Sequence, residues 1–253
     1  MHAAISEDAA PATDAGDAIA ARVAALDWAG IARDLDASGC ATTGPILTVA
    51  ECRAVAALYD TPDDGLFRSR VVMARHGYGS GEYRYFAAPL PPLVQALRQS
   101  LYAPLAPVAD RWNAAMGLPA RYPASLPEFT ARCHAAGQTR PTPLLLRYGT
   151  GDYNCLHQDV YGEHLFPLQC AFMLADPATD FTGGEFVLTE QRPRMQSRAE
   201  VVPLRQGEAV IFAVRHRPVQ GRSGVYRVAM RHGVSRLREG RRHTLGIIFH
   251  DAA

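Results

Sequence analysis

The chain has 253 residues, of which 48% are hydrophobic and 20% charged, so a large core can form and global disorder is not expected. The net charge of +1 gives no strong preference for charged partners, and no stretch approaches the ~20 apolar residues of a transmembrane helix, so no membrane partner is expected. No lysine or arginine precedes Arg22 and the five cysteines lack paired spacing, so we expect no secretory leader, reduced thiols and a cytoplasmic location.

The first half of the chain has a mainly helical pattern. Residues 1–16 are rich in alanine, proline and aspartate, and we expect a disordered tail there. Apolar residues then recur at helical spacing over Asp17–Asp36, and Thr48-Val-Ala-Glu51 is a capping-box start for a second helix that runs to about Tyr59. We expect residues 17–138 to form a mainly helical support region.

Two later segments of this half are unusual. Glycine and aromatic residues alternate in Gly77–Phe86, which fits either a mobile lid with stacking groups or an edge hairpin with one aromatic face on the core. Aromatic residues are more often core residues, which favours the hairpin. Leu90–Met116 has a helical pattern that Pro104 and Pro107 are expected to break.

From residue 139 onwards, short β-type runs alternate with turn residues. Eight strands at such spacing predict a closed or two-sheet β architecture such as a jelly roll, and helices that precede it pack on one sheet from outside. The predicted fold is therefore α+β, with a double-stranded β-helix (jelly-roll) core at residues 139–253 and the N-terminal helices packed on one sheet. The predicted strands are Pro143–Tyr148, Cys155–Gln158, Leu168–Leu174, Glu185–Leu188, Glu200–Pro203, Ala209–Phe212, Val225–Arg231 and His243–Phe249.

The start of this region presents two side chains suited to a metal ion. Leu144–Asp159 begins as an apolar strand, turns at Gly149 and Gly151, and places His157 and Asp159 two residues apart. Residues i and i+2 of an extended backbone point to the same face, so an imidazole and a carboxylate emerge side by side. Most His-x-Asp pairs are structural, and a metal site needs a third ligand from elsewhere.

Three histidines are candidates for the third ligand. His164 follows the pair too closely to return from another strand. His216 is flanked by arginines and closely followed by Pro218, which places it on a loop. His232 closes a run in which Val228 and Met230 share its face, so it follows two core positions on one strand. We therefore choose His232.

Arginine is concentrated near the C-terminus. No lysine occurs, and half of the 26 arginines lie between Arg192 and Arg242, with only Glu200, Glu208 and Glu239 as acids. This local excess of positive charge suits an anionic substrate or cosubstrate, because guanidinium groups contact carboxylates and phosphates in a bidentate manner. The alternative is that arginine usage reflects genome composition and that many of these side chains are solvated.

Several motifs together resemble a known superfamily. His157-x-Asp159, the distant His232 and Arg242 ten residues later resemble the iron and cosubstrate pattern of the 2-oxoglutarate/Fe(II)-dependent dioxygenases. A hairpin of that length after His232 would return Arg242 to the metal ligands. The resemblance covers about Leu144 to His250, and its ordered motifs are more specific than His-x-Asp alone. The flanking motifs are the double-glycine turn Gly183–Phe186, the hairpin Pro203–Phe212 and the G-x-R run Gly240–Arg242.

The resemblance implies an Fe(II) ion held by His157, Asp159 and His232, with 2-oxoglutarate and dioxygen as cosubstrates. Two imidazoles and one carboxylate on one face of Fe(II) leave three coordination positions open, which is the facial triad of non-haem oxygenases. The implied reaction oxidises a C–H bond and decarboxylates 2-oxoglutarate to succinate.

Three further residues are expected to contact 2-oxoglutarate. Arg242 would clamp its distal carboxylate, Thr244 would add a hydrogen bond from the same strand face, and Tyr148 would hydrogen-bond it from the opposite strand. The alternatives are a surface salt bridge for Arg242 and a buried, satisfied phenol for Tyr148. A register shift of one residue would give the role of Arg242 to Arg241.

The substrate is less well specified. Arg147–Asp159, with its Leu-His-Gln-Asp run, resembles the AlkB-type dealkylation enzymes, whereas Gly240–Arg242 is closer to prolyl-hydroxylase-like members. The whole chain is most similar to a family of uncharacterised prokaryotic oxygenases described as acting on damaged nucleic acid. That resemblance implies oxidative dealkylation, as in DNA repair, of damaged or single-stranded nucleic acid. The alternatives are a hydroxylase of a peptide or small molecule, and a non-catalytic β-barrel that binds a metal.

Overall fold

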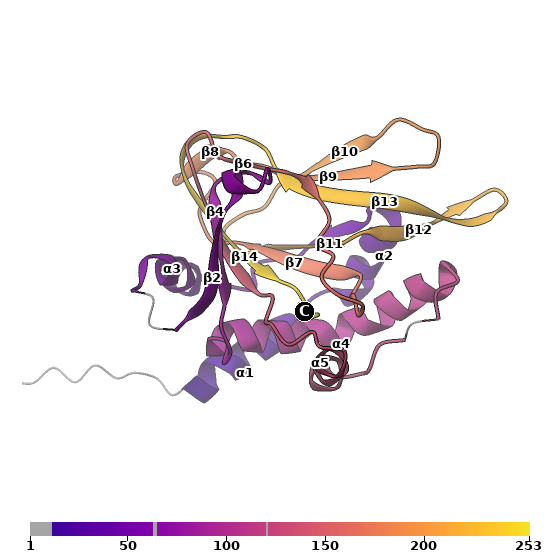
Figure 1. Ribbon diagram of the computed structural model, residues 1–253, viewed down its shortest axis with the longest axis horizontal. Helices are drawn as coiled ribbons and strands as arrows, with labels where there is room; N and C mark the ends of the chain where they lie inside the picture. Colours follow the sequence, from indigo (N-terminus) through magenta and orange to yellow (C-terminus); the bar gives the residue numbers. More distant parts are fainter. Residues whose placement is uncertain (1–11, 63–64, 120) are drawn as a thin grey trace, which may run out of the picture.

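The computed structural model describes residues 12–62, 65–119 and 121–253, in which two antiparallel sheets face each other (Figure 1). Residues 1–11 of the predicted tail lie outside the described residues, and the first helix begins at Ala12. The helices are α1 (Ala12–Ala24), α2 (Trp28–Ser38), α3 (Val49–Ala57), α4 (Pro92–Ala115) and α5 (Leu126–Ala135), with 3-10 turns η1 (Leu58–Asp60) and η2 (Met73–Arg75).

Side-chain caps fix two helix starts. The single helix predicted over Asp17–Asp36 is wrong, because α1 ends at Ala24 and α2 begins at Trp28. Asp27 caps α2 by accepting a hydrogen bond from the Gly30 N–H (2.9 Å). The predicted capping box of α3 is confirmed. Thr48 Oγ1 accepts from the Glu51 N–H (3.2 Å), and the Glu51 carboxylate accepts from the Thr48 N–H (2.7 Å).

Helix α4 continues through Pro104 and Pro107, so the predicted break is wrong. A proline inside a helix costs about 3 kcal/mol, because it removes one N–H and its ring meets the preceding turn. Burial of the long apolar face outweighs this cost, since α4 packs against α1 and the end of β14. The fully or almost fully buried side chains of this face are Val94, Leu97, Leu101, Tyr102, Leu105, Ala109 and Trp112.

The strands form two sheets of unequal size. The larger has eight strands in the order β1-β11-β7-β14-β5-β4-β2, with β8 paired to β14, and the smaller has six in the order β10-β9-β13-β6-β3, with β12 paired to β13. The larger sheet contains β1 (Cys40–Thr42), β2 (Phe67–Val72), β4 (Glu82–Phe86), β5 (Leu144–Gly149), β7 (Leu168–Met173), β8 (Phe181–Gly183), β11 (Ala209–Ala213) and β14 (Leu237–Ile247). The smaller contains β3 (Gly79–Ser80), β6 (Tyr153–His157), β9 (Phe186–Gln191), β10 (Arg198–Val202), β12 (His216–Gly221) and β13 (Gly224–Val234).

The eight strands predicted after residue 139 are present, with their ends shifted. The short strands β8 and β12 were not predicted. His216 begins β12, so its predicted place on a loop is wrong. Pro218 is accommodated there because β12 pairs only with β13 and is an edge strand, where a missing N–H is tolerated.

The predicted hairpin between His232 and Arg242 is also wrong. Strand β13 belongs to the smaller sheet and β14 to the larger, so the chain crosses from one sheet to the other between Val234 and Leu237. Arg242 therefore reaches the site from the facing sheet. This arrangement of facing antiparallel sheets is the predicted jelly-roll core, mixed with helices.

The helices cover the larger sheet from outside. Figure 1 shows α1, α4 and α5 on the side of β7 and β14 that faces away from the smaller sheet. This confirms the predicted packing of N-terminal helices on one sheet. Residues 17–138 also supply β1, β2 and β4 to the larger sheet and β3 to the smaller one.

Candidate functional site

A cavity of about 430 Å³ lies between the two sheets. This volume is in the range of small-molecule sites, which are usually apolar with a few convergent polar groups. Both sheets supply its wall, so its shape depends on the packing of the whole core. The polar and aromatic side chains that line it include Tyr78, Tyr83, Tyr85, Tyr148, Asn154, His157, Asp159, Tyr161, Gln169, Phe186, Phe212, His232, Arg242 and Thr244.

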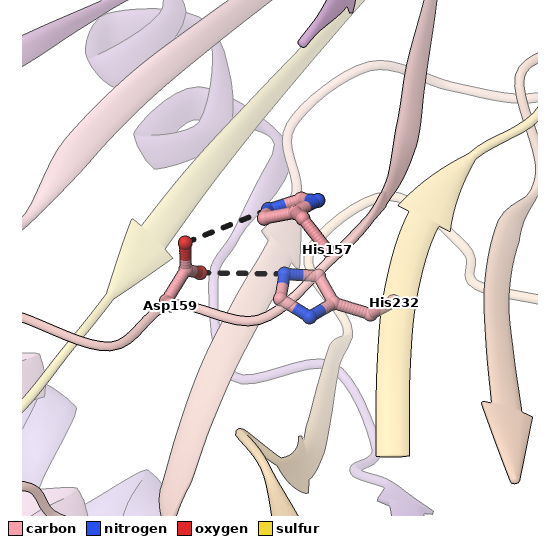
Figure 2. Close-up of side chains that lie close together, drawn as sticks. All are labelled: His157, Asp159 and His232. Carbon is pink, nitrogen blue, oxygen red and sulfur yellow. Dashed lines mark ion pairs between the residues drawn. The ribbon is translucent and has the colours of Figure 1, made fainter. Parts of the chain in front are cut away.

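The structure brings His157, Asp159 and His232 together at this cavity (Figure 2). His157 ends β6 and lies opposite His232 of β13 in the paired register. His157 Nε2 is 3.5 Å from Asp159 Oδ1, and His232 Nε2 is 3.3 Å from Asp159 Oδ2. One ligand atom from each residue lies within 4.8 Å of the others, which is close enough to share one metal ion.

Neighbouring groups hold these three side chains in place. His157 Nδ1 lies 2.8 Å from the Cys155 carbonyl oxygen, which directs Nε2 of the same ring toward Asp159. The two oxygens of Asp159 accept hydrogen bonds from Tyr161 Oη and from Gln169 Nε2, each at 2.8 Å. Such contacts orient metal ligands and tune their basicity.

The charges of the cluster suit a divalent cation. Burial raises the pKa of Asp159, but hydrogen bonds and charge from His157 and His232 outweigh it and hold that pKa well below its ordinary value. Burial, followed by the charge of His157, lowers the pKa of His232. Burial also acts to lower the pKa of His157, but Asp159 outweighs it and raises the pKa. A metal binds an ionised carboxylate and neutral imidazoles. The pKa shifts of Asp159 and His232 favour these states, whereas His157 would have to release the proton that its raised pKa favours.

The donor set fits Fe(II). Two imidazole nitrogens and one carboxylate are the combination of non-haem Fe(II) oxygenases, whereas zinc sites of structural type carry four ligands and often cysteine. The described residues contain no fourth histidine, cysteine or acidic ligand in the cluster. The remaining coordination positions would therefore face the cavity.

Arg242 forms a cationic wall of the same cavity. Its side chain is fully buried and, among the described residues, forms no ion pair with a carboxylate. Nη1 donates to Thr244 Oγ1 (2.6 Å), while Nε and Nη2 have no partner. Burial lowers the pKa of Arg242 to about 10, so the group stays charged at neutral pH. An unpaired buried cation costs several kcal/mol, which an anionic ligand would offset.

Glycine at position 184 makes room for this guanidinium. Gly183 and Gly184 have φ values of 72° and 64°, which favour glycine and form the predicted double-glycine turn before β9. A Cβ on Gly184 would lie 2.6 Å from Leu237 Cδ1 and 3.1 Å from Arg242 Cδ. A side chain at position 184 would therefore displace Leu237 and crowd the stem of Arg242.

Tyr148 and Thr244 lie beside Arg242 as the strand pattern predicted. Tyr148 pairs in register with Arg242, is fully buried, and accepts a weak hydrogen bond from Asn154 Nδ2 (3.4 Å). The Arg242 guanidinium carbon is 5.5 Å from the Tyr148 ring centre. Arg241 is exposed and points to the other face of β14, so the structure does not support its exchange with Arg242.

Four residues of the site were not predicted from the sequence. Tyr161 and Gln169 contact Asp159, Tyr85 donates to Tyr161 (3.2 Å), and Asn154 contacts Tyr148. Tyr161 had a signal, because it follows Asp159 by two residues as Asp159 follows His157, and Tyr85 lies in the aromatic segment Gly77–Phe86. The others come from separate strands, and no local pattern places them together.

The segment Gly77–Phe86 crosses from one sheet to the other. Strand β3 pairs with β6 in the smaller sheet, and β4 pairs with β5 and β2 in the larger. Tyr83 and Tyr85 line the cavity from β4, whereas Tyr78 lines it at the surface and is 50% exposed. The segment thus has features of both predicted alternatives, with inner aromatics in the core and an outer one at the mouth.

A sequence-family comparison matches most of the chain. The Oxygenase-NA family, described as an oxygenase catalysing oxidative methylation of damaged DNA, matches residues 81–252. Two relatives from Mycobacterium tuberculosis, each named an uncharacterized protein, are 52% identical over 168 residues, which cover 66% of this chain and 72% of each relative. The match includes every residue of the triad and of the Arg242 wall.

Solved structures share the fold at low sequence identity. A 2OG-Fe(II) oxygenase-family oxidoreductase from Burkholderia pseudomallei has a TM-score of 0.52 at 16% identity and covers 89% of this chain and 93% of its own. A Pseudomonas putida prolyl-4-hydroxylase has a TM-score of 0.51 at 14% identity, covering 89% and 100%. A Trichoplax adhaerens prolyl hydroxylase, in complex with a hypoxia-inducible-factor peptide, has a TM-score of 0.52 at 13% identity, covering 96% and 94%.

The structure of this chain also bears on membrane association. Within the described ranges, no helix combines the length and the apolar character needed to cross a bilayer.

Proposed function

Because the chain belongs to the Oxygenase-NA family, we propose that it removes alkyl groups from damaged nucleic acid by oxidation, with Fe(II) as cofactor and 2-oxoglutarate and dioxygen as cosubstrates. Family and fold together indicate a 2-oxoglutarate/Fe(II) oxygenase, and the His-Asp-His cluster provides its metal site. The substrate class is the proposed part. It rests on the description of the family and on a cavity that opens to the protein surface.

One observation carries the proposal most directly. A single cavity contains a facial set of two histidines and one carboxylate and, on the opposite sheet, the buried guanidinium of Arg242 without an acidic partner. A dicarboxylate with a 2-oxo group at one end would satisfy both features. A purely structural metal site would not require Arg242.

The residues of the chain would act by binding and positioning. His157, Asp159 and His232 would hold Fe(II), which when bound supplies the activation of dioxygen coupled to decarboxylation of 2-oxoglutarate to succinate and carbon dioxide. The Nε and Nη2 groups of Arg242 would donate to the distal carboxylate. Thr244 accepts from Arg242, so its own proton is free to donate to the same carboxylate.

The substrate would react at a carbon attached to nitrogen. One oxygen atom of dioxygen enters the C–H bond of the alkyl group and the other enters succinate, so the reaction balances without a further reductant. The resulting N-hydroxymethyl group releases formaldehyde and returns a proton to the nitrogen. Phe186 and Phe212, which lie against His232, exclude water from this side of the cavity (ring centroids 6.0 and 4.6 Å from that of His232).

A hydroxylase acting on a peptide is the second candidate. The observation in its favour is the similarity of the fold to two prolyl hydroxylases, one of them in complex with a peptide. The same triad and the same arginine would serve that reaction. The two candidates differ in the substrate and in the release of formaldehyde.

The deciding experiment is a substrate panel with two readouts. Fe(II)-loaded protein is given methylated single-stranded DNA, proline-containing peptides or free amino acids, and succinate and formaldehyde are measured together. We expect both products in equal amounts from methylated DNA, and neither from His157→Ala or Asp159→Ala. Succinate stimulated by a peptide, without formaldehyde, would replace the first candidate with the second. Turnover that survives both substitutions would refute the triad.

A further inference from the structure

A shallow groove, here called the rim groove, adjoins the cavity on the outer side of His157. It is lined by Leu156, His157, Gln158, Val160, Arg215 and Arg231. Three of these residues, at positions 156–158, also line the main cavity, so the two spaces meet at a metal ligand. A chain of atoms that leaves the cavity on this side must therefore cross the rim groove.

The two arginines of the rim groove are held at its edge but are not neutralised. Gln158 Nε2 donates to the backbone oxygens of Arg215 (3.2 Å) and Met230 (2.8 Å), which ties the segments that carry both arginines to the loop between His157 and Asp159. Both arginine side chains are exposed. Among the described residues, neither forms an ion pair, and no acidic residue lines the groove.

The remaining surface at the cavity mouth is apolar or aromatic. Leu156 and Val160 are 44% and 39% exposed in the rim groove. Tyr78, 50% exposed, lines the mouth of the cavity and stacks on His76 at a ring-centroid distance of 5.3 Å. Cationic groups beside exposed aromatic rings are the combination that binds single-stranded nucleic acid, in which phosphates meet arginine and bases stack.

We propose that Arg215 and Arg231 bind phosphates of a single strand next to the nucleotide whose base enters the cavity. The inference rests on the proposed function. The role that it assigns to the rim groove does not itself require the triad. A base inside a duplex cannot reach a buried cavity, so the strand is single or locally opened. Leu156 and Val160 then contact the sugar between the two phosphates.

The test measures the salt dependence of binding. The probe is a DNA pentanucleotide with a central N-methylated base, bound to Fe(II)- and 2-oxoglutarate-loaded protein without oxygen. Removal of both cations in Arg215→Gln/Arg231→Gln should raise Kd about tenfold or more at low salt. It should also reduce the slope of log Kd against log salt by about 1.4, since each phosphate contact on a single strand contributes about 0.7.

Two control variants accompany this measurement. Arg222→Gln removes an exposed arginine at the turn between β12 and β13, roughly 25 Å or more along β13 from the triad and beyond the reach of a pentanucleotide. Its slope should match that of the unchanged protein. Arg215→Lys/Arg231→Lys retains the charges and should restore most of the slope, which separates phosphate binding from a loss of folding.

The outcomes distinguish the inference from the proposed function. If methylated DNA yields formaldehyde but the glutamine double variant keeps the same Kd and slope, the rim groove is not the phosphate site. If the double variant loses the slope but no formaldehyde forms, the rim groove binds nucleic acid and the proposed reaction is wrong. Absence of binding by the unchanged protein, or tighter binding of an oligoglutamate peptide than of DNA at equal salt, would overturn the inference.

Discussion

Arg242 and Arg241 are sequence neighbours that meet opposite environments. The alternation of β14 buries one guanidinium in the cavity and exposes the other to solvent. Burial of an unpaired cation is unfavourable for the fold alone, so a structural role would leave Arg242 poorly explained. The proposed binding of a carboxylate would explain both its burial and the two nitrogens, Nε and Nη2, that have no hydrogen-bond partner.

Substitution of Arg242 should separate ligand binding from stability. Arg242→Gln should raise the KM for 2-oxoglutarate at least about 30-fold, as expected for the loss of a charge-assisted hydrogen bond worth roughly 2 kcal/mol. The ligand-free variant should be no less stable than the unchanged protein, because an uncompensated buried charge has been removed. Initial rates and urea unfolding check the two parts, with Arg241→Gln as the control. Equal KM values for both variants would refute the carboxylate clamp.

Substitution of Tyr161 should weaken binding of the metal rather than binding of the cosubstrate. Tyr161→Phe removes the hydrogen bond to Asp159 Oδ1 and should weaken Fe(II) binding about 10- to 100-fold, the usual effect of losing a partner of a metal ligand. Anaerobic titration of the metal-free protein with Fe(II) measures this directly. Tyr153→Phe alters an exposed ring and should bind as before. Unchanged affinity in Tyr161→Phe would mean that Gln169 alone fixes the carboxylate.

The contacting residues of the site differ in how far sequence can predict them. His157 and Asp159 were identifiable because one extended stretch places both on one face. His232 was chosen because it follows two core positions on one strand, and the role of Arg242 required the ordered pattern of a known superfamily. Gln169 was not identifiable, because its proximity to Asp159 arises only when β7 and the loop after β6 come together in the folded chain.

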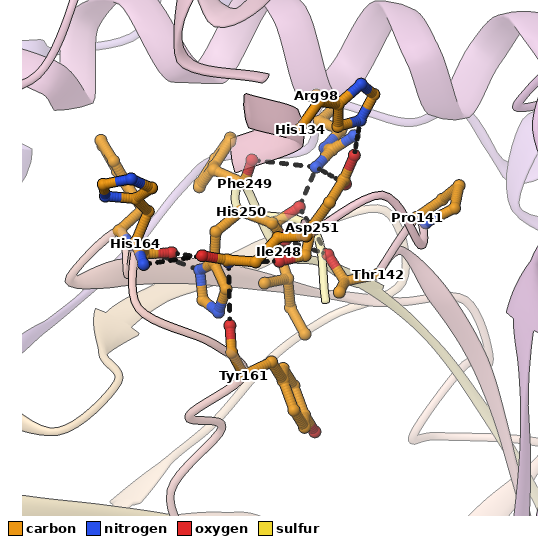
Figure 3. A network of polar contacts seen from close by, with 12 residues as sticks. Arg98, His134, Pro141, Thr142, Tyr161, His164, Ile248, Phe249, His250 and Asp251 are labelled. Carbon is orange, nitrogen blue, oxygen red and sulfur yellow. Dashed lines mark hydrogen bonds and ion pairs between the residues drawn. The ribbon is translucent and has the colours of Figure 1, made fainter. Parts of the chain in front are cut away.

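At the scale of elements, one arginine joins the long helix to the last strand. Arg98 of α4 donates to the Ile248 and Phe249 carbonyl oxygens, each at 2.9 Å, and to Asp251 Oδ1 at 2.6 Å (Figure 3). His134 of α5 contacts the other oxygen of Asp251 (2.9 Å). The segment 248–251, which follows the strand that carries Arg242, is thus anchored to α4 by buried polar contacts and to α5 by a part-buried one.

Loss of Arg98 should therefore destabilise the protein strongly. Arg98→Leu should lower the free energy of unfolding by about 3–5 kcal/mol, because Asp251 would remain buried without its charged partner. Adding Asp251→Leu should cost little more or restore stability. Arg111→Leu in the same helix breaks an exposed pair with Asp36 and should cost less than about 1 kcal/mol. Urea unfolding checks all three, and similar losses for Arg98→Leu and Arg111→Leu would contradict this account.

Two predictions at this scale, the break in α4 and the hairpin after His232, were wrong for physical reasons. Pro104 and Pro107 oppose helix formation locally, but burial of α4 in the folded chain outweighs that preference. The ten-residue separation of His232 and Arg242 fits a hairpin and a crossing between sheets equally well. Sequence spacing gives the length of a connection, whereas the choice of sheet depends on pairing with β5 and β7, which lie far away in the chain.

In the whole molecule, the helices and the cavity lie on opposite faces of the larger sheet. Helices lie on the outer face of the larger sheet, and the cavity lies between the sheets, with its mouth on the side of Tyr78 and the rim groove. The jelly roll was predictable because strand and turn signals repeat at regular spacing. The short strand β1 was not predictable. A hairpin over Gly77–Phe86 was favoured, but the pairing of β3 with one sheet and of β4 with the other depends on strands far away in the chain.

The buried His250 and the part-buried His243 should make the stability of this architecture depend on pH. Burial lowers the pKa of His250 to about 4, and burial with the nearby Arg147 and Arg241 charges lowers that of His243 to about 4. In the unfolded chain their pKa is near 6.5, so between these values unfolding takes up protons. Stability is therefore fully present above pH 6.5 and falls as the pH decreases toward 4, by on the order of 3 kcal/mol per histidine.

The variant His250→Asn tests the assignment of this pH dependence. Asparagine places an oxygen near the position of Nδ1, which accepts the Phe166 N–H at 3.2 Å, and it does not titrate. Urea unfolding of the metal-free protein at pH 7.5, 6.5, 5.5 and 4.5 should give a smaller loss of stability for His250→Asn than for the unchanged chain. His243→Asn should act in the same direction. An identical slope in the variants and the unchanged protein would show that the acid sensitivity arises from carboxylates instead.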